Sequence, residues 1–107
     1  MITYDEFKKV ELKVGEVKTA ERVVGSEKLL KLIVEIGEPT PRQIIAGIGK
    51  VYAPETLVGK QIVIVTNLES RMLMGLESQG MVLATHDESG PIILLPERPA
   101  QPGAVIS

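Results

Sequence analysis

The 107-residue sequence predicts a small, mainly β protein whose short strands close into an antiparallel barrel. Apolar and polar residues alternate with period two in several short stretches, which is the pattern of strands with one buried face. In the first stretch the alternation changes phase at Gly15, as it does at a β-bulge that bends a strand. Apolar types make up 44% of the chain, enough for the core of one domain, which we expect to span residues 1–107.

Two short helices are expected. Thr3 and the glutamate three residues later have capping-box spacing, which predicts a helix over residues 3–9. Residues 53–60 begin with proline and glutamate and close with glycine, which is typical of a single helical turn. Its Leu57 and Val58 are expected to plug one end of the barrel.

The strands are short and numerous. Alternating or β-rich runs predict strands at 11–17, 29–36, 43–48, 62–65, 80–85 and 91–95, with a final edge strand at 104–106. Turn-forming residues at 86–90 predict a solvated turn. Five to seven such strands favour a barrel of the oligonucleotide/oligosaccharide-binding type (OB-fold), with a sandwich or an SH3-like barrel as alternatives.

Composition excludes several classes of function. The chain has no cysteine and one histidine, which excludes disulfide scaffolds, thiolate metal sites and multi-histidine sites, so no cofactor is expected. No stretch without a charged residue exceeds nine residues, far short of a membrane-spanning helix. The acidic start is unlike a signal peptide, so we expect a cytoplasmic protein without a membrane partner.

Two motifs that suggest enzymes are weak. Gly75 and Gly80 have phosphate-loop spacing, but the next residue is methionine, where such a loop needs lysine. His86 and Asp87 could form a base and its orienting carboxylate, but they precede a turn and no nucleophile is placed near them. The sequence therefore predicts no enzyme and no small-molecule substrate.

Binding is the more promising class, although the net charge is only −2. Basic residues on predicted strands and loops could gather on one barrel face, or they could be ordinary surface charge. Only three aromatic residues exist, too few for a platform that stacks single-stranded bases, so any RNA is expected to be bound by shape and backbone. Residues 67–81 form a long predicted connection with three of the four methionines, which is either functional or a cap on the barrel end.

Several sequence blocks resemble the tRNA-binding domain family, found at the end of many methionyl-tRNA synthetases and as a free-standing protein or beta subunit. The resemblance covers nearly the whole length, and its clearest blocks are 7–15, 25–32, 42–48, 52–60 and 75–81. It implies a five-stranded OB-fold with extra C-terminal strands, a homodimer, and no catalysis. It further implies that the domain binds tRNA by shape and raises the tRNA affinity of methionyl-tRNA synthetase, in cis or in trans.

The resemblance also implies a site. Ser78 and Met81 match family positions linked to tRNA contact. Asn67, Arg71 and Gln79 lie in the same motif, and Lys28 and Lys31 match basic positions near the barrel face. Hydroxyl and amide groups would meet ribose and phosphate while a methionine packs on a sugar or base.

This chain departs from the family pattern in its methionine-rich segment. Family members commonly have lysine, lysine and arginine where this sequence has Glu69, Met72 and Met74, and proline where it has Ser70. The first three changes amount to a swing of four charge units, which predicts weak tRNA binding. The alternative function is a protein-interaction, dimerisation or chaperone-like module that docks a protein on its methionines.

Overall fold

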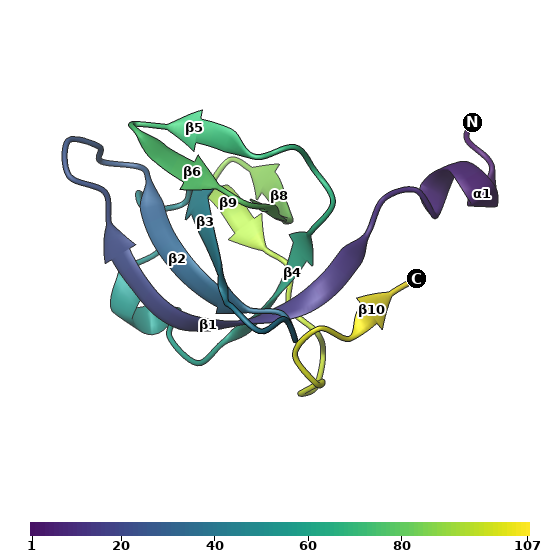
Figure 1. Cartoon of the computed structure of the whole chain (residues 1–107). Helices are drawn as coiled ribbons and strands as arrows, with labels where there is room; N and C mark the ends of the chain where they lie inside the picture. The colour runs from purple at the N-terminus through teal and green to yellow at the C-terminus, as the bar shows by residue number, and fades with distance from the viewer.

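A curved antiparallel sheet forms the body of the molecule in the computed structural model, which describes residues 1–107 (Figure 1). Its strands run in the order β3-β2-β1-β4-β7, with these bounds: β1 Leu12–Arg22, β2 Leu30–Glu35, β3 Arg42–Ala46, β4 Gln61–Val65 and β7 Met81–Val82. The long β1 pairs with β4 through its first half and with β2 through its second half. The predicted five-stranded barrel is confirmed.

No ladder of backbone hydrogen bonds joins β3 to β7. Side chains and one backbone hydrogen bond close the barrel between these strands instead. The backbone N–H of Gln79 donates to the Gln43 carbonyl at 2.8 Å, and the Gln79 side-chain oxygen accepts from the Gln43 N–H at 2.9 Å. The Ser78 hydroxyl accepts from the Ile45 N–H at 2.9 Å. These bonds satisfy the backbone groups along the open edge of β3.

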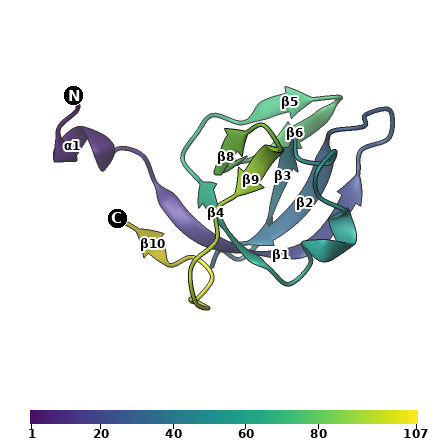
Figure 2. The ribbon, with the colours of Figure 1, turned by 180° about the vertical axis from the view of Figure 1, so that it is seen from behind.

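Twelve buried apolar residues fill the barrel, and the alternation of β2 supplies Leu30, Leu32 and Val34. Leu57 is 1% exposed and closes one end, next to the 3₁₀ turn η1 (Pro54–Thr56), which Figure 2 shows beside β1. Val58 does not join it, since half of this side chain is exposed. With three residues per turn, adjacent side chains of such a helix point in different directions.

The phase change at Gly15 has a different cause from the predicted bulge. β1 pairs regularly with β4 through this position, and its bulge lies between Val17 and Thr19. Gly15 faces the core, where a Cβ atom would come within 2.5 Å of a Val34 methyl. Val14, on the opposite face, is also buried, and its N–H donates to the C-terminal segment at 2.9 Å. Both faces of β1 are covered here, so the alternation breaks.

Residues 67–81 are not one long connection. They contain the hairpin β5 (Arg71–Leu73) to β6 (Leu76–Ser78), joined by Met74 and Gly75. Both turn residues have positive φ, 51° and 79°, as a type I′ turn requires. The hairpin was missed because methionine is an unusual residue at the first turn position, where asparagine or aspartate is the common signal.

The predicted strand 80–85 is split into β7 and β8 (Ala84–Asp87), which pairs with β9 (Gly90–Ile93). The break falls at Leu83, whose N–H donates to Val63 of β4 while its carbonyl accepts from Leu94. The chain thus changes pairing partner at this residue. The β8–β9 turn matches the predicted solvated turn.

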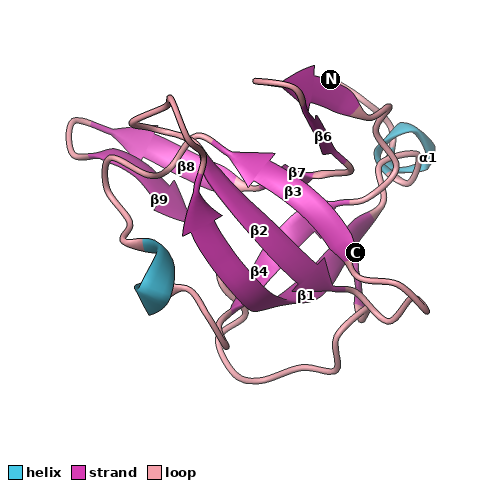
Figure 3. Ribbon diagram, turned by 60° about the vertical axis from the view of Figure 1, so that its left-hand side comes forward, coloured by secondary structure: helices cyan, strands magenta, loops and turns pink.

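The N-terminal arm (residues 1–10) projects from the barrel. Its helix α1 (Tyr4–Phe7) has the predicted capping box at Thr3 but is one turn long. The C-terminal strand β10 (Val105–Ile106) lies beside the start of β1. Figure 3 shows the two helical turns on opposite sides of the sheet. Neither α1 nor η1 has the length of a membrane-spanning helix.

Candidate nucleic-acid interface

One end of the barrel brings together the two loops with which OB-folds bind nucleic acids. The 23–29 loop joins β1 to β2, and the β5–β6 hairpin lies between β4 and β7; Figure 1 shows them side by side. The hairpin places Leu73 and Leu76 against a small apolar cluster of Val23, Leu29 and Ile45. This packing fixes the hairpin on the outer face of β3.

A basic cluster (Arg22, Lys28 and Lys50) surrounds the backbone of Gly49 next to this loop. The Arg22 guanidinium donates to the Gly49 carbonyl at 2.8 Å, and the Gly49 N–H donates to the Lys28 carbonyl at 2.7 Å. Lys50 follows directly in the chain, and none of the three side chains forms an ion pair. The predicted site omitted Arg22 and Lys50, although Arg22 could have been found from its position at the start of the 23–29 loop.

The structure brings only some of the seven sequence-predicted site residues together. Arg71, Ser78 and Met81 line one cavity of about 150 Å³, together with Leu68 and other residues. Lys28 and Lys31 lie separately, on the 23–29 loop and on β2. The Lys31 ammonium is 2.7 Å from the Glu21 carboxylate, so it is already paired, whereas the exposed Lys28 and Arg71 have no ion-pair partner.

Three of the seven predicted residues hold the fold together through their side chains. Asn67 accepts from the Glu11 N–H at 2.8 Å and donates to the Lys9 carbonyl at 2.6 Å, tying the hairpin segment to the N-terminal arm. Ser78 is 5% exposed and also donates to the Gly80 carbonyl at 3.0 Å. Gln79 closes the barrel as described above. The role of these residues in tRNA contact stays a prediction.

Arg42 connects the 36–41 turn to the segment that closes the barrel. Its guanidinium binds both Glu38 carboxylate oxygens, at 2.9 and 2.8 Å, and donates to the Gln79 carbonyl at 3.0 Å. The hydrogen bonds from Arg42 lower the pKa of Glu38, and the same contact raises the pKa of Arg42. With its donors engaged in this way, Arg42 is not available to a phosphate group.

No aromatic side chain lies at this end of the barrel. Tyr52 packs against the core and its hydroxyl accepts from the Ile93 N–H at 3.1 Å, while Tyr4 and Phe7 belong to the N-terminal arm. The interface therefore offers cations, amides and aliphatic groups but no stacking platform.

His86 and Asp87, which suggested an enzyme, are the last two residues of β8, beside the β8–β9 turn. The Asp87 carboxylate accepts from both the Ser89 N–H, at 2.8 Å, and the Ser89 hydroxyl, at 2.6 Å, which lowers the pKa of Asp87. It is thus bound within the turn that follows the exposed His86. No group of acidic or histidine side chains could hold a metal ion.

Comparison with known proteins extends these observations. The family model for a tRNA binding domain matches residues 12–105, which include both loops and the hairpin. This chain belongs to the tRNA binding domain family. The tRNA binding domain is a non-catalytic module.

The relatives of this tRNA binding domain include a methionine–tRNA ligase, a MetRS-related protein and a chaperone. It is 47% identical over 105 residues to a methionine–tRNA ligase of Methanocella arvoryzae, covering 98% of this chain and 15% of the ligase. Among solved structures, a MetRS-related protein of Pyrococcus horikoshii has a TM-score of 0.92 at 37% identity, with 100% of this chain and 98% of that one covered. The chaperone CsaA of Bacillus anthracis has a TM-score of 0.90 at 30% identity, with 100% and 99% covered.

Proposed function

We propose that this tRNA binding domain recognises tRNA through shape and backbone and raises the tRNA affinity of methionyl-tRNA synthetase. It acts as a homodimer, either within the synthetase polypeptide or as a separate subunit. The observation that carries the proposal is the match of nearly the whole chain, at 47% identity, to part of a methionine–tRNA ligase. This chain spans only about 15% of that ligase. In the proposed function it contributes RNA binding, while the rest of the ligase carries the catalysis.

The charges at the interface support phosphate contact. Arg22, Lys28, Lys50 and Arg71 are the cations near the two loops that form no ion pair. Each phosphate contact releases counterions, so binding weakens as salt is added. With about four such contacts, log K should fall with a slope of about −3 to −4 against log salt.

A salt titration of binding to a mixed tRNA pool tests this proposal. The double change Lys28→Gln and Lys50→Gln should reduce the slope by about 2, since it removes two contacts. Lys60→Gln is the control for the loss of a single positive charge elsewhere, because this exposed lysine follows η1 and lies outside the interface. No binding at low salt, or an equal effect of both variants, would reject the phosphate-contact model.

A second candidate function rests on the exposed methionines. Met72, Met74 and Met81 are each 46% exposed or more, and CsaA, at 30% identity, is described as a chaperone. Methionines are adaptable contacts on protein-binding surfaces. Suppression of aggregation of a chemically unfolded client, undiminished by excess tRNA, would favour this function over tRNA binding.

A further inference from the structure

A cavity of about 330 Å³ lies between the tip of the β5–β6 hairpin and the 23–29 loop, next to the basic cluster. Its apolar lining consists of Val23, Val24, Met74 and Leu76. Its charged lining consists of Glu21, Arg22 and Lys31. We propose that this cavity is a base slot that holds one unstacked nucleobase of a bound RNA. The inference rests on the proposed function and adds to it a subsite that selects RNA with an unpaired base.

The apolar walls suit the faces of a flat ring. Val24 is 94% exposed and Met74 58% exposed, so the unbound protein leaves both side chains in water. The Met74 methyl lies 3.3 Å from the position that a Cβ on Gly25 would occupy, which brings the thioether against the 23–29 loop. Thioethers make favourable contacts with aromatic rings. In an interface without aromatic side chains, Met74 can supply the ring contact.

The charged lining suits the edge of a base. The Glu21 carboxylate accepts hydrogen bonds and the Lys31 ammonium, 2.7 Å away, donates them, so the pair presents both kinds of group side by side. Arg22 uses one nitrogen for Gly49 and keeps further donors. Two cations and one anion give the lining a net charge of +1, which tolerates a neighbouring phosphate. Unpaired bases are the part of RNA whose edges proteins can reach.

The test compares two RNAs whose backbones differ by a single phosphate: a fully paired duplex without a loop, and the same duplex with one bulged nucleotide. The full chain should bind the bulged RNA about tenfold more tightly, in line with the measured effect of base contacts. Met74→Asn should abolish this preference and leave the affinity for the paired duplex unchanged. Asparagine before glycine is the preferred type I′ pair, so this variant keeps the hairpin.

Met72→Thr is the matched control. Met72 is similarly exposed on the same hairpin but lies outside the cavity, so the bulge preference should persist in this variant. Methyl NMR supplies a second readout, because the chain has only four methionines. The Met74 methyl signal should shift upfield with bulged RNA while the Met72 signal stays in place.

Each other outcome overturns the base slot in a recognisable way. If tRNA binds but the bulge has no effect, the slot is absent and the proposed function survives. If neither RNA nor tRNA binds, both proposals fail together. Free nucleoside monophosphates could also shift the Met74 methyl signal. If they do so at concentrations as low as those at which the bulged RNA does, the occupant is a small nucleotide and not a base of RNA. If an unfolded client shifts it and RNA does not, the surface binds protein.

Discussion

At the scale of single residues, Ser78 shows how a buried polar group can matter for binding without touching a ligand. Its hydroxyl satisfies the Ile45 N–H and the Gly80 carbonyl at the closure of the barrel. Ser78→Ala would leave the Ile45 N–H unsatisfied, so we expect a loss of about 1–3 kcal/mol in the free energy of unfolding. Urea denaturation measures this loss, and the m-value should not change.

Ser70→Ala is the control for this prediction. Ser70 is exposed in the same segment and makes no hydrogen bond, so the change should stay within about 0.5 kcal/mol. If Ser78→Ala keeps full stability but loses tRNA affinity, the hydroxyl contacts RNA and the structural explanation is wrong.

The Glu38–Arg42 pair makes a prediction about pH. The pKa of Glu38 in the folded protein is lowered from its ordinary value of 4.5, chiefly by its hydrogen bonds with Arg42. A lowered pKa means that the pair stabilises the fold above about pH 4.5 and that this contribution is lost as the pH falls through the folded value. Glu38→Gln should therefore be less stable than wild type at pH 7.

The difference in midpoint between Glu38→Gln and wild type should shrink below pH 4 in thermal unfolding. It should be modest throughout, because the Glu38 side chain is 36% exposed and solvent screens the pair. A difference that stays constant from pH 7 to pH 3 would show that the carboxylate charge is not what matters.

At the scale of elements, Glu69, Met72 and Met74 in and just before the β5–β6 hairpin stand where the family resemblance implies basic residues. Restoring the basic pattern with Glu69→Lys, Met72→Lys and Met74→Arg adds four charge units to one exposed segment. We expect roughly tens- to thousandfold tighter tRNA binding at moderate salt, with a slope against log salt steeper by about 3. The measurement is the salt titration of tRNA binding.

Its control places the same charge change elsewhere. Glu55→Lys, Thr56→Lys and Val58→Arg also add four units, on exposed residues in and just after η1. If this variant gains as much affinity as the hairpin variant, net charge explains the gain and the hairpin has no special role.

The hairpin also shows which parts of the structure the sequence could predict. Strands such as β2 were predictable because one face is buried and the other is not, which leaves a period of two. The β5–β6 hairpin lies outside the barrel, and its apolar contacts with the small cluster on β3 come from Leu73 and Leu76, so it leaves no such period. In β1, Val14 is covered by the C-terminal segment, which follows it by about ninety residues in the sequence. The local sequence around Val14 therefore gives no sign of this contact.

The candidate site was predictable to a similar, partial extent. Residue types suggested polar contact, but the sequence could not distinguish a side chain that faces solvent from one that ties two strands. Arg71 and Met81 are exposed, whereas the side chains of Asn67 and Ser78 form hydrogen bonds with backbone groups. That distinction depends on which distant backbone groups lack partners, and only the closed barrel determines it.

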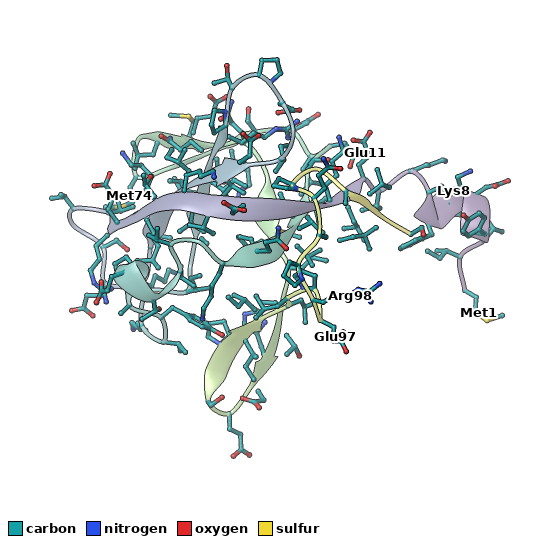
Figure 4. All side chains as sticks on the ribbon, turned by 90° about the horizontal axis from the view of Figure 1, so that it is seen from below. Met1, Lys8, Glu11, Met74, Glu97 and Arg98 are labelled. Carbon is teal, nitrogen blue, oxygen red and sulfur yellow. The ribbon has the colours of Figure 1, made fainter.

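At the scale of the whole molecule, the interface and the N-terminal arm lie at opposite ends. Figure 4 shows Met74 at one end and Met1 and Lys8 at the other, and the longest dimension is 41 Å. The arm and β10 expose apolar side chains together, among them Ile2, Tyr4 and Val105, each more than 60% exposed. Such a patch is typical of an association surface. Pairing two arms would leave both base slots and both basic clusters open.

The proposed homodimer therefore has a specific test. Val105→Glu places a charge on the most exposed apolar residue of β10, and we expect the mass in solution to fall from twice the chain mass to 11.6 kDa. Light scattering measures this mass. Val58→Glu is the matched control, since it adds the same charge to an exposed valine at a distance from the arm and should leave the dimer intact.

The consequence for RNA follows from valency. Two interfaces joined rigidly can engage one tRNA at a high effective concentration, so loss of the dimer should weaken tRNA binding roughly a hundredfold or more. A short stem-loop that reaches only one interface should bind the Val105→Glu monomer as well as it binds the dimer. Equal weakening for both RNAs would mean that the arm shapes the interface itself, and an unchanged mass would mean that the copies meet elsewhere.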